Sequence, residues 1–249
     1  MLLAALFGVI ALLYASVGFG GGSSYLALLV LWGLPFAIIP MLALACNIIV
    51  VSGSSLHYVQ AGHFNKRLLA PYLIGSIPFS YLGGTLTIGQ VLFEWLIFLS
   101  LLIAGLLLVW QHKAFDDPHA NYRIPSLSLA ITVGAVLGFL SGIIGIGGGI
   151  FLAPVLHLLR AGSPRQIATT ASLFILINST AGLLGHLQKS GFSEMLLTHW
   201  PLLLAVFVGG QIGNLLSLKY FPRRILVLTT GLLVLFVSLR MGTKLTGLL

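Results

Sequence analysis

Apolar segments of helical length follow one another along almost the whole chain, with only short polar stretches between them. Ten can be marked, at residues 1–17, 20–33, 36–60, 68–87 and 90–110, and then at 126–143, 147–160, 165–188, 197–219 and 223–243. Their lengths fit membrane helices better than the strands of about 10 residues with alternating polarity that build membrane barrels. The pattern therefore predicts an all-α integral membrane protein.

A polar stretch at residues 111–125 divides the chain into two halves that align with each other. Gly18 and Gly145 are 127 residues apart, and Gly83 and Gly213 are 130 apart, so the landmarks keep an almost constant spacing. Such spacing indicates two homologous units of five helical segments each. We expect a first transmembrane repeat at 1–110, a linker at 111–125 and a second transmembrane repeat at 126–249.

A glycine cluster separates the first two segments of each half, at residues 18–22 and again at 145–149. Glycine leaves backbone groups uncovered, which is tolerated at membrane depth only where they face protein, water or a ligand. The segment 20–33 would be about 21 Å long as a helix, too short for a hydrocarbon core of about 30 Å. Either the helix is broken inside the membrane, or the first two segments form a re-entrant hairpin that reaches part of the way.

The distribution of lysine and arginine favours the hairpin. If both pairs fold back, one side of the membrane receives nine of the twelve basic residues, whereas one broken span per pair divides them five against seven. By the positive-inside rule this side is the cytoplasm, so both termini lie on the other side of what we expect to be a bacterial inner membrane. The two halves are then inverted relative to each other. The nine are Lys66, Arg67, Lys113, Arg123, Arg160, Arg165, Lys219, Arg223 and Arg224.

Composition agrees with a chain that has no sizeable soluble domain. Hydrophobic residues make up 58% of it and charged residues 6%, and the mean hydropathy is +1.10, whereas soluble domains carry about 25% charged residues. The net charge of +8 comes from bases that lie mostly in loops, where they orient the chain and contact anionic lipid. We therefore expect lipid and a small molecule as partners and no nucleic acid. Cys46 is the one cysteine, which excludes an intrachain disulfide and a cysteine metal cluster.

The glycine clusters are the first candidate substrate site. Neither has the Lys-Ser/Thr of a P-loop or the context of a dinucleotide fingerprint. Successive backbone N–H groups at the start of a helix, with the helix dipole behind them, attract anions without a cationic side chain. The alternative is close packing of membrane helices through small residues. The candidates are Gly20, Gly21, Gly22, Ser23 and Ser24, together with Gly147, Gly148 and Gly149.

Polar neutral side chains in the third and fourth segments of each half extend this candidate site. Hydroxyl and amide groups bind an oxyanion well and stay uncharged, but they also form interhelical hydrogen bonds worth about 1 kcal/mol or less. Buried amides are the stronger candidates, because burying an amide costs more than burying a hydroxyl. The residues are Asn47, Ser52, Thr169, Thr170, Ser172, Asn178 and Gln211.

The titratable residues narrow the class of function. His57 and His186 occupy matching positions and are candidates for a proton-linked role, although their places at the ends of segments favour an interfacial or capping role. None of the four acids, Glu94, Asp116, Asp117 and Glu194, lies in the middle of a segment, which disfavours cation transport. With no metal-ligand spacing and no catalytic motif, we expect neither an enzyme nor a metal or cofactor site.

The two halves resemble a known family. GIIGIGGGIFLAPVL, followed by SPRQIATTASLFILINSTAGLLGHLQKSG, is similar to the second half of TauE/SafE proteins, and GFGGGSSYLALLVLWGLP is similar to the first half. The resemblance runs over residues 6–239. It implies permeation of small sulfur-containing anions such as sulfite, sulfoacetate or related carboxylates and sulfonates. The contacts it implies lie at Gly20–Ser23, Gly147–Gly149 and Thr169–Ser172.

Taken together, the residues predict a secondary transporter for a small, most plausibly sulfur-containing, oxyanion that moves by alternating access around a site at the midplane. A channel for the same anions and a carrier of small carboxylates remain as alternatives. The sequence leaves the oligomeric state open.

Overall fold

The computed structural model describes residues 1–110, 122–190, 198–216 and 223–245, which are mostly helical and contain no strand. The prediction of an all-helical fold is confirmed for these residues. The helices are α1 (Leu2–Val17), α2 (Gly22–Leu31), α3 (Ile39–Gln60), α4 (Lys66–Thr85), α5 (Gln90–Trp110), α6 (Leu127–Ile144), α7 (Gly149–Leu158), α8 (Pro164–Ser190), α10 (Trp200–Leu216) and α11 (Arg223–Leu245). Most of the predicted linker lies outside the described residues.

The outer surface of this bundle is apolar, as a lipid-facing surface must be. Leu215 is 79% exposed, Val91 68% and Phe236 64%. Four helices, α3, α5, α6 and α8, are long and apolar enough to cross a membrane. Together with the shorter apolar helices they make a multi-pass membrane protein.

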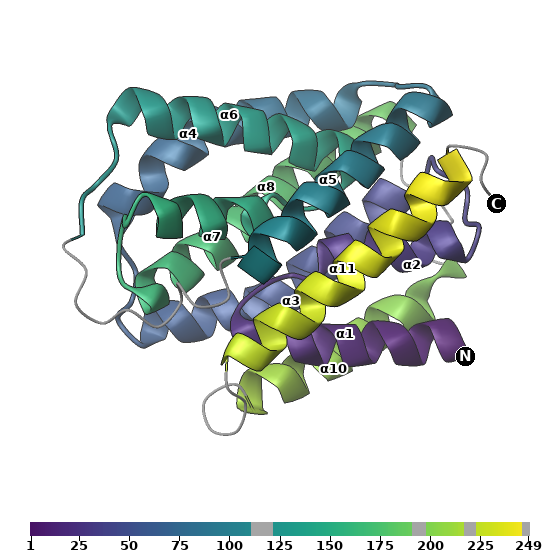
Figure 1. The fold of residues 1–249 in the computed structure, drawn as a ribbon, viewed down its shortest axis with the longest axis horizontal. Coiled ribbons are helices and arrows are strands. Elements are labelled where there is room, and N and C mark those ends of the chain that lie inside the picture. Colours follow the sequence, from purple (N-terminus) through teal and green to yellow (C-terminus); the bar gives the residue numbers. More distant parts are fainter. Residues whose placement is uncertain (111–121, 191–197, 217–222, 246–249) are drawn as a thin grey trace.

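The first two helices of each half form a hairpin. α1 and α2 run in opposite directions along the longest axis of the molecule, and so do α6 and α7 (Figure 1). α2 and α7 have ten residues each, about 15 Å of helix. The short segments allowed either a broken helix or a hairpin. The structure has the hairpin, in which the chain turns back part of the way through the bundle once in each half.

Glycine makes both turns possible, because several of their residues have positive φ. α1 ends at Gly18 with φ 85°, and α6 ends at Gly145 with φ 90°. The short helices begin after Gly21 with φ 82° and Gly148 with φ 74°. The left-handed region is routinely accessible only to glycine, so each cluster ends one helix and starts the next within a few residues.

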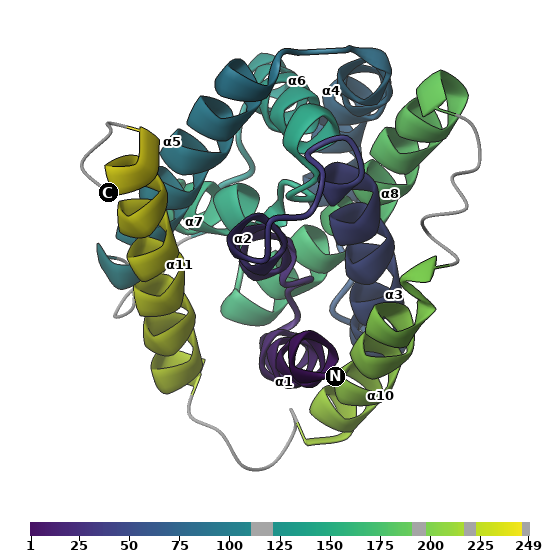
Figure 2. The ribbon, with the colours of Figure 1, turned by 90° about the vertical axis from the view of Figure 1, so that its right-hand side faces the viewer.

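Glycine also lets two of the longer helices pack backbone against backbone. α4 and α6 lie side by side (Figure 2). Cβ atoms added at Gly134, Gly138 and Gly142 would lie 2.2, 2.4 and 2.0 Å from the carbonyl oxygens of Tyr72, Ser76 and Ser80. The close-packing role of small residues in membrane helices therefore applies to this pair of helices.

Candidate functional site

The two glycine clusters, 127 residues apart in the sequence, meet in the centre of the molecule. A Cβ added at Gly22, the first residue of α2, would lie 2.5 Å from the carbonyl oxygen of Ile146 in the second cluster. Gly20, Gly22, Gly147 and Ile146 are all buried. The break in one half therefore touches the break in the other half, at a junction that lies inside the protein.

Asn47 of α3 lies between the two clusters and binds them together. Its side chain is fully buried, and its Nδ2 donates to the carbonyl oxygens of Ile146 at 3.1 Å and Gly145 at 3.5 Å. The same side chain faces the first cluster, because Cβ atoms added at Gly20 and Gly22 would lie 2.5 Å from its Oδ1 and Nδ2. No described residue donates a hydrogen bond to Oδ1. The amide predicted from sequence thus contacts both halves.

α8 contributes two side chains that sequence reasoning did not select. Ile175 approaches both clusters, with its Cγ2 3.2 Å from a Cβ added at Gly20 and 2.9 Å from one added at Gly147. The hydroxyl of Ser179 lies 3.0 Å from the latter position and has no hydrogen-bond partner among the described residues. The junction is therefore asymmetric, with an amide from α3 and an isoleucine and a hydroxyl from α8.

Both short helices point their N-terminal ends at this junction. The first intrahelical bond of α2 comes from the Ser24 N–H and that of α7 from the Phe151 N–H, and neither helix has a side-chain cap. The N–H groups that precede these donors are left without an intrahelical acceptor. Each helix end carries the equivalent of about +0.5 charge. Two such ends meeting in a buried region make it electropositive with no cationic side chain.

The serines that follow the first cluster contact Tyr14 of α1. Its hydroxyl lies 2.8 Å from the Ser24 Oγ and 3.3 Å from the Ser23 Oγ, and all three side chains are buried. This network holds the two arms of the first hairpin together beside the break. Sequence reasoning missed Tyr14, although an aromatic hydroxyl in an apolar helix needs a partner and was a usable signal.

The other predicted residues of α8 are buried but bond elsewhere. Ser172 shares a hydrogen bond of 2.8 Å with Ser55 of α3. Thr169 donates to the Arg165 carbonyl oxygen, one turn back in its own helix. Thr170 is buried as well, at 1% exposure. The bond of Ser172 therefore lies at the interface of α3 and α8, and that of Thr169 lies within α8.

Three further predicted residues have their known contacts elsewhere. Asn178 uses its Nδ2 within α8, for the Phe174 carbonyl oxygen at 2.9 Å. Ser52 is exposed and donates to the carbonyl oxygen of Ile49. Gln211 of α10 lies beside Gly53, where its Nε2 would be 3.5 Å from an added Cβ. Among the predicted side chains outside the clusters, the structure thus brings Asn47 to the junction.

The two matching histidines differ in their surroundings. His57 is exposed in the last turn of α3. His186 is 3% exposed, and its Nε2 lies 2.8 Å from the Gly142 carbonyl oxygen. His57 therefore fits the interfacial role, whereas His186, enclosed between α4, α6 and α8, fits the capping role, because Gly142 lies in the last turn of α6. A position near the end of a helix did not reveal that neighbouring helices cover it.

A helical membrane protein with two half-helices that begin at its centre has the arrangement seen at the substrate sites of secondary transporters. Comparison with known sequences also indicates a membrane transporter. The profile of the family described as Sulfite exporter TauE/SafE matches residues 2–241. The chain belongs to this family of membrane transporters.

Proteins with similar sequences carry transporter names as well. A protein of Sinorhizobium fredii named "Probable membrane transporter protein y4hK" is 34% identical over 243 residues, which cover 96% of both chains. A protein of Bacillus subtilis named "Probable membrane transporter protein YunE" is 25% identical over 251 residues, which cover 88% of this chain and 89% of the relative. No solved structure matches the chain.

Proposed function

We propose that this protein is a secondary transporter for a small anion, namely a sulfur-containing oxyanion such as sulfite or an organosulfonate. The observation that carries the proposal is the meeting of two uncapped helix N-termini in the buried centre, beside Asn47. The free backbone N–H groups would stabilise the negative charge, and the amide and hydroxyl groups around them would complete its shell.

The charges around the junction support an anion over a cation. Glu94 is the one carboxylate among the described residues, and it accepts a hydrogen bond from Gln90 at the start of α5. A cation at the junction would meet the positive ends of two helices with no acidic side chain beside it. An oxyanion meets donors there. The proposed substrate contacts are Gly20, Gly21, Gly22, Ser23, Asn47, Gly147, Gly148 and Gly149.

The proposed mechanism requires the two clusters to separate. A methyl group at Gly22 would lie 2.5 Å from the Ile146 carbonyl oxygen, so no oxyanion fits between these two groups in this closed conformation. Substrate binding would break the hydrogen bonds from Asn47 to Ile146 and Gly145 and replace them with bonds to the anion. A junction that closes on itself favours a carrier over an open channel.

Helix packing supports two inverted repeats that rock about this junction. α4 packs along α6 and against α8, while α10 packs along α1 and against α3. Among the described helices, α4 is the fourth of the first half, 1–110, and α10 is the fourth of the second half, 126–249. Each of them therefore packs against the first and third helices of the other half. α1 begins at one end of the longest axis and α6 at the other (Figure 1). Opposed repeats of this kind are the usual basis of alternating access.

The orientation can be tested with single cysteines, because Cys46 is fully buried. α4 is 20 residues long, about 30 Å, so the exposed residues Lys66 and Thr87 lie towards opposite ends of the bundle. With the basic loops in the cytoplasm, a membrane-impermeant maleimide added to intact cells is expected to label Thr87→Cys and not Lys66→Cys. The reverse labelling would contradict the proposed orientation.

The function itself can be tested by reconstitution. Proteoliposomes should take up sulfite or methanesulfonate with saturation, and more weakly or not at all take up sodium ions. Sulfate and acetate in the same assay distinguish a sulfonate carrier from a general oxyanion or carboxylate carrier. Uptake of none of the four anions above that of empty liposomes would overturn the proposal.

A further inference from the structure

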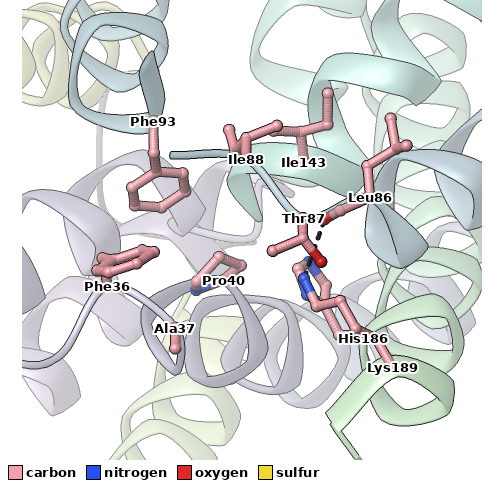
Figure 3. A pocket seen from close by; sticks show the side chains of 10 residues that line it. All are labelled: Phe36, Ala37, Pro40, Leu86, Thr87, Ile88, Phe93, Ile143, His186 and Lys189. Carbon is pink, nitrogen blue, oxygen red and sulfur yellow. Dashed lines mark hydrogen bonds between the residues drawn. The ribbon is translucent and has the colours of Figure 1, made fainter. Parts of the chain in front are cut away.

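A cavity of about 280 Å³ opens between the start of α3, the α4–α5 loop and the end of α8 (Figure 3). Its walls differ in character. Phe36 and Phe93 lie on one side, and Thr87, His186 and Lys189 lie on the other. None of its lining residues is acidic. The cavity lies at the end of the bundle where α4 and α8 finish, which is the end opposite the basic loops.

His186, one of the residues that line this cavity, has a ring nitrogen without a hydrogen-bond partner among the described residues. A carbonyl oxygen can only accept a hydrogen bond, so the Nε2 that lies 2.8 Å from the Gly142 oxygen carries the hydrogen. In the neutral ring Nδ1 then holds a lone pair. The side chain is 3% exposed, and Nδ1 has no hydrogen-bond partner among the described residues. A buried acceptor of this kind favours a ligand that brings its own donor.

Lys189, one turn further along α8, supplies the positive charge. Its ammonium group donates to the Leu86 carbonyl oxygen at 3.0 Å, and an ammonium group has three donors. No carboxylate in the cavity wall neutralises it. The cavity thus combines a cation that has spare donors with a histidine lone pair that needs a donor.

The cavity lies next to the central junction. Pro40 lines it, and the Cα of Pro40 is 2.7 Å from a Cβ added at Gly145. The carbonyl oxygen of Gly145 is one of the two that accept from Asn47. A single residue of α3 therefore separates the cavity from the glycine cluster of the second half.

We propose, resting on the anion transport proposed above, that this cavity is a second anion site, on the side of the membrane opposite the basic loops, that prefers anions carrying a hydroxyl group. Lys189 binds the anionic group, and the Nδ1 of His186 accepts the hydroxyl hydrogen. An anion without a donor leaves this nitrogen unpaired, which lowers its affinity. The site selects the anion at this end of the bundle before the junction between the glycine clusters opens.

Isethionate and propane-1-sulfonate test the preference, because they match in charge and length and differ in a hydroxyl group against a methyl group. Calorimetric titration of the detergent-solubilised full chain is expected to show isethionate binding about fivefold more tightly. His186→Phe fills a similar space and removes the ring lone pair without supplying another acceptor, so the two affinities should become equal. Lys189→Gln should weaken both about fivefold or more.

Two controls come from the opposite end of the bundle. His57→Phe and Lys66→Gln change the same residue types at exposed positions and should leave both affinities as in the wild type. Equal affinities in the wild type, or undiminished binding in Lys189→Gln, would overturn the second site. Binding is measured separately from flux. Binding that depends on Lys189, without any flux, supports the second site and contradicts the proposed transport. Flux together with binding that is unchanged in Lys189→Gln supports transport and contradicts the second site.

Discussion

Gly22→Ala is expected to reduce anion uptake at least about tenfold and to lower the free energy of unfolding by about 1–3 kcal/mol. The new methyl group would lie 2.5 Å from both the Ile146 carbonyl oxygen and the Asn47 Nδ2. A backbone carbonyl cannot move aside alone, so the two breaks must separate and lose their closed contact. Uptake by proteoliposomes and thermal unfolding in detergent measure the two effects.

Gly89→Ala is the matched control. Gly89 lies in the α4–α5 loop, has no positive φ, and an added Cβ there would have no heavy atom within 4 Å. Both uptake and stability should match the wild type. If Gly22→Ala behaves like Gly89→Ala, the two breaks do not need to meet for transport, and the junction is not the substrate site.

Asn47→Leu is expected to have the second large effect. Leucine has a similar size but cannot donate to Ile146 or Gly145, so their two buried carbonyl oxygens lose a partner. A buried acceptor left without a donor costs about 1–3 kcal/mol, and the anion loses the one amide at the junction. Uptake should fall at least about tenfold, and the melting temperature should fall as well.

Asn178→Leu provides the comparison for Asn47→Leu, since both residues are fully buried asparagines in the middle of long helices. The Nδ2 of Asn178 donates to the Phe174 carbonyl oxygen within α8, and its Oδ1 has no partner in the part of the chain that the structure describes. Its replacement should change uptake by less than about threefold. A larger loss with Asn178→Leu than with Asn47→Leu would contradict a site at Asn47 and assign it to α8.

Much of this arrangement could be predicted from the sequence, because it follows from backbone chemistry. Clusters of glycine end helices whatever surrounds them, and their repetition at a spacing of 127 residues indicated corresponding places in two halves. Charge in the loops favoured the hairpin that the structure has. Asn47 could be selected because a buried amide in an apolar helix needs a partner, and the structure supplies two carbonyl oxygens.

The rest could not be predicted, because it depends on which side of each helix faces the junction. α3 and α8 are apolar on nearly all sides, so the period of hydrophobic residues did not distinguish the buried Asn47 from the exposed Ser52. The same ambiguity hid Ser179, which is adjacent in sequence to the selected Asn178. Ile175 carried no chemical signal at all, since its role is to pack against glycine.

The most direct test of the central claim is counterflow of labelled sulfite in proteoliposomes. Liposomes preloaded with unlabelled sulfite should take up the label faster than liposomes without it. Uptake should saturate, and Asn47→Leu should remove the stimulation. Uptake that does not saturate and is not stimulated by preloading, or stimulation that persists in Asn47→Leu, would contradict a carrier that binds its anion where the two glycine clusters meet.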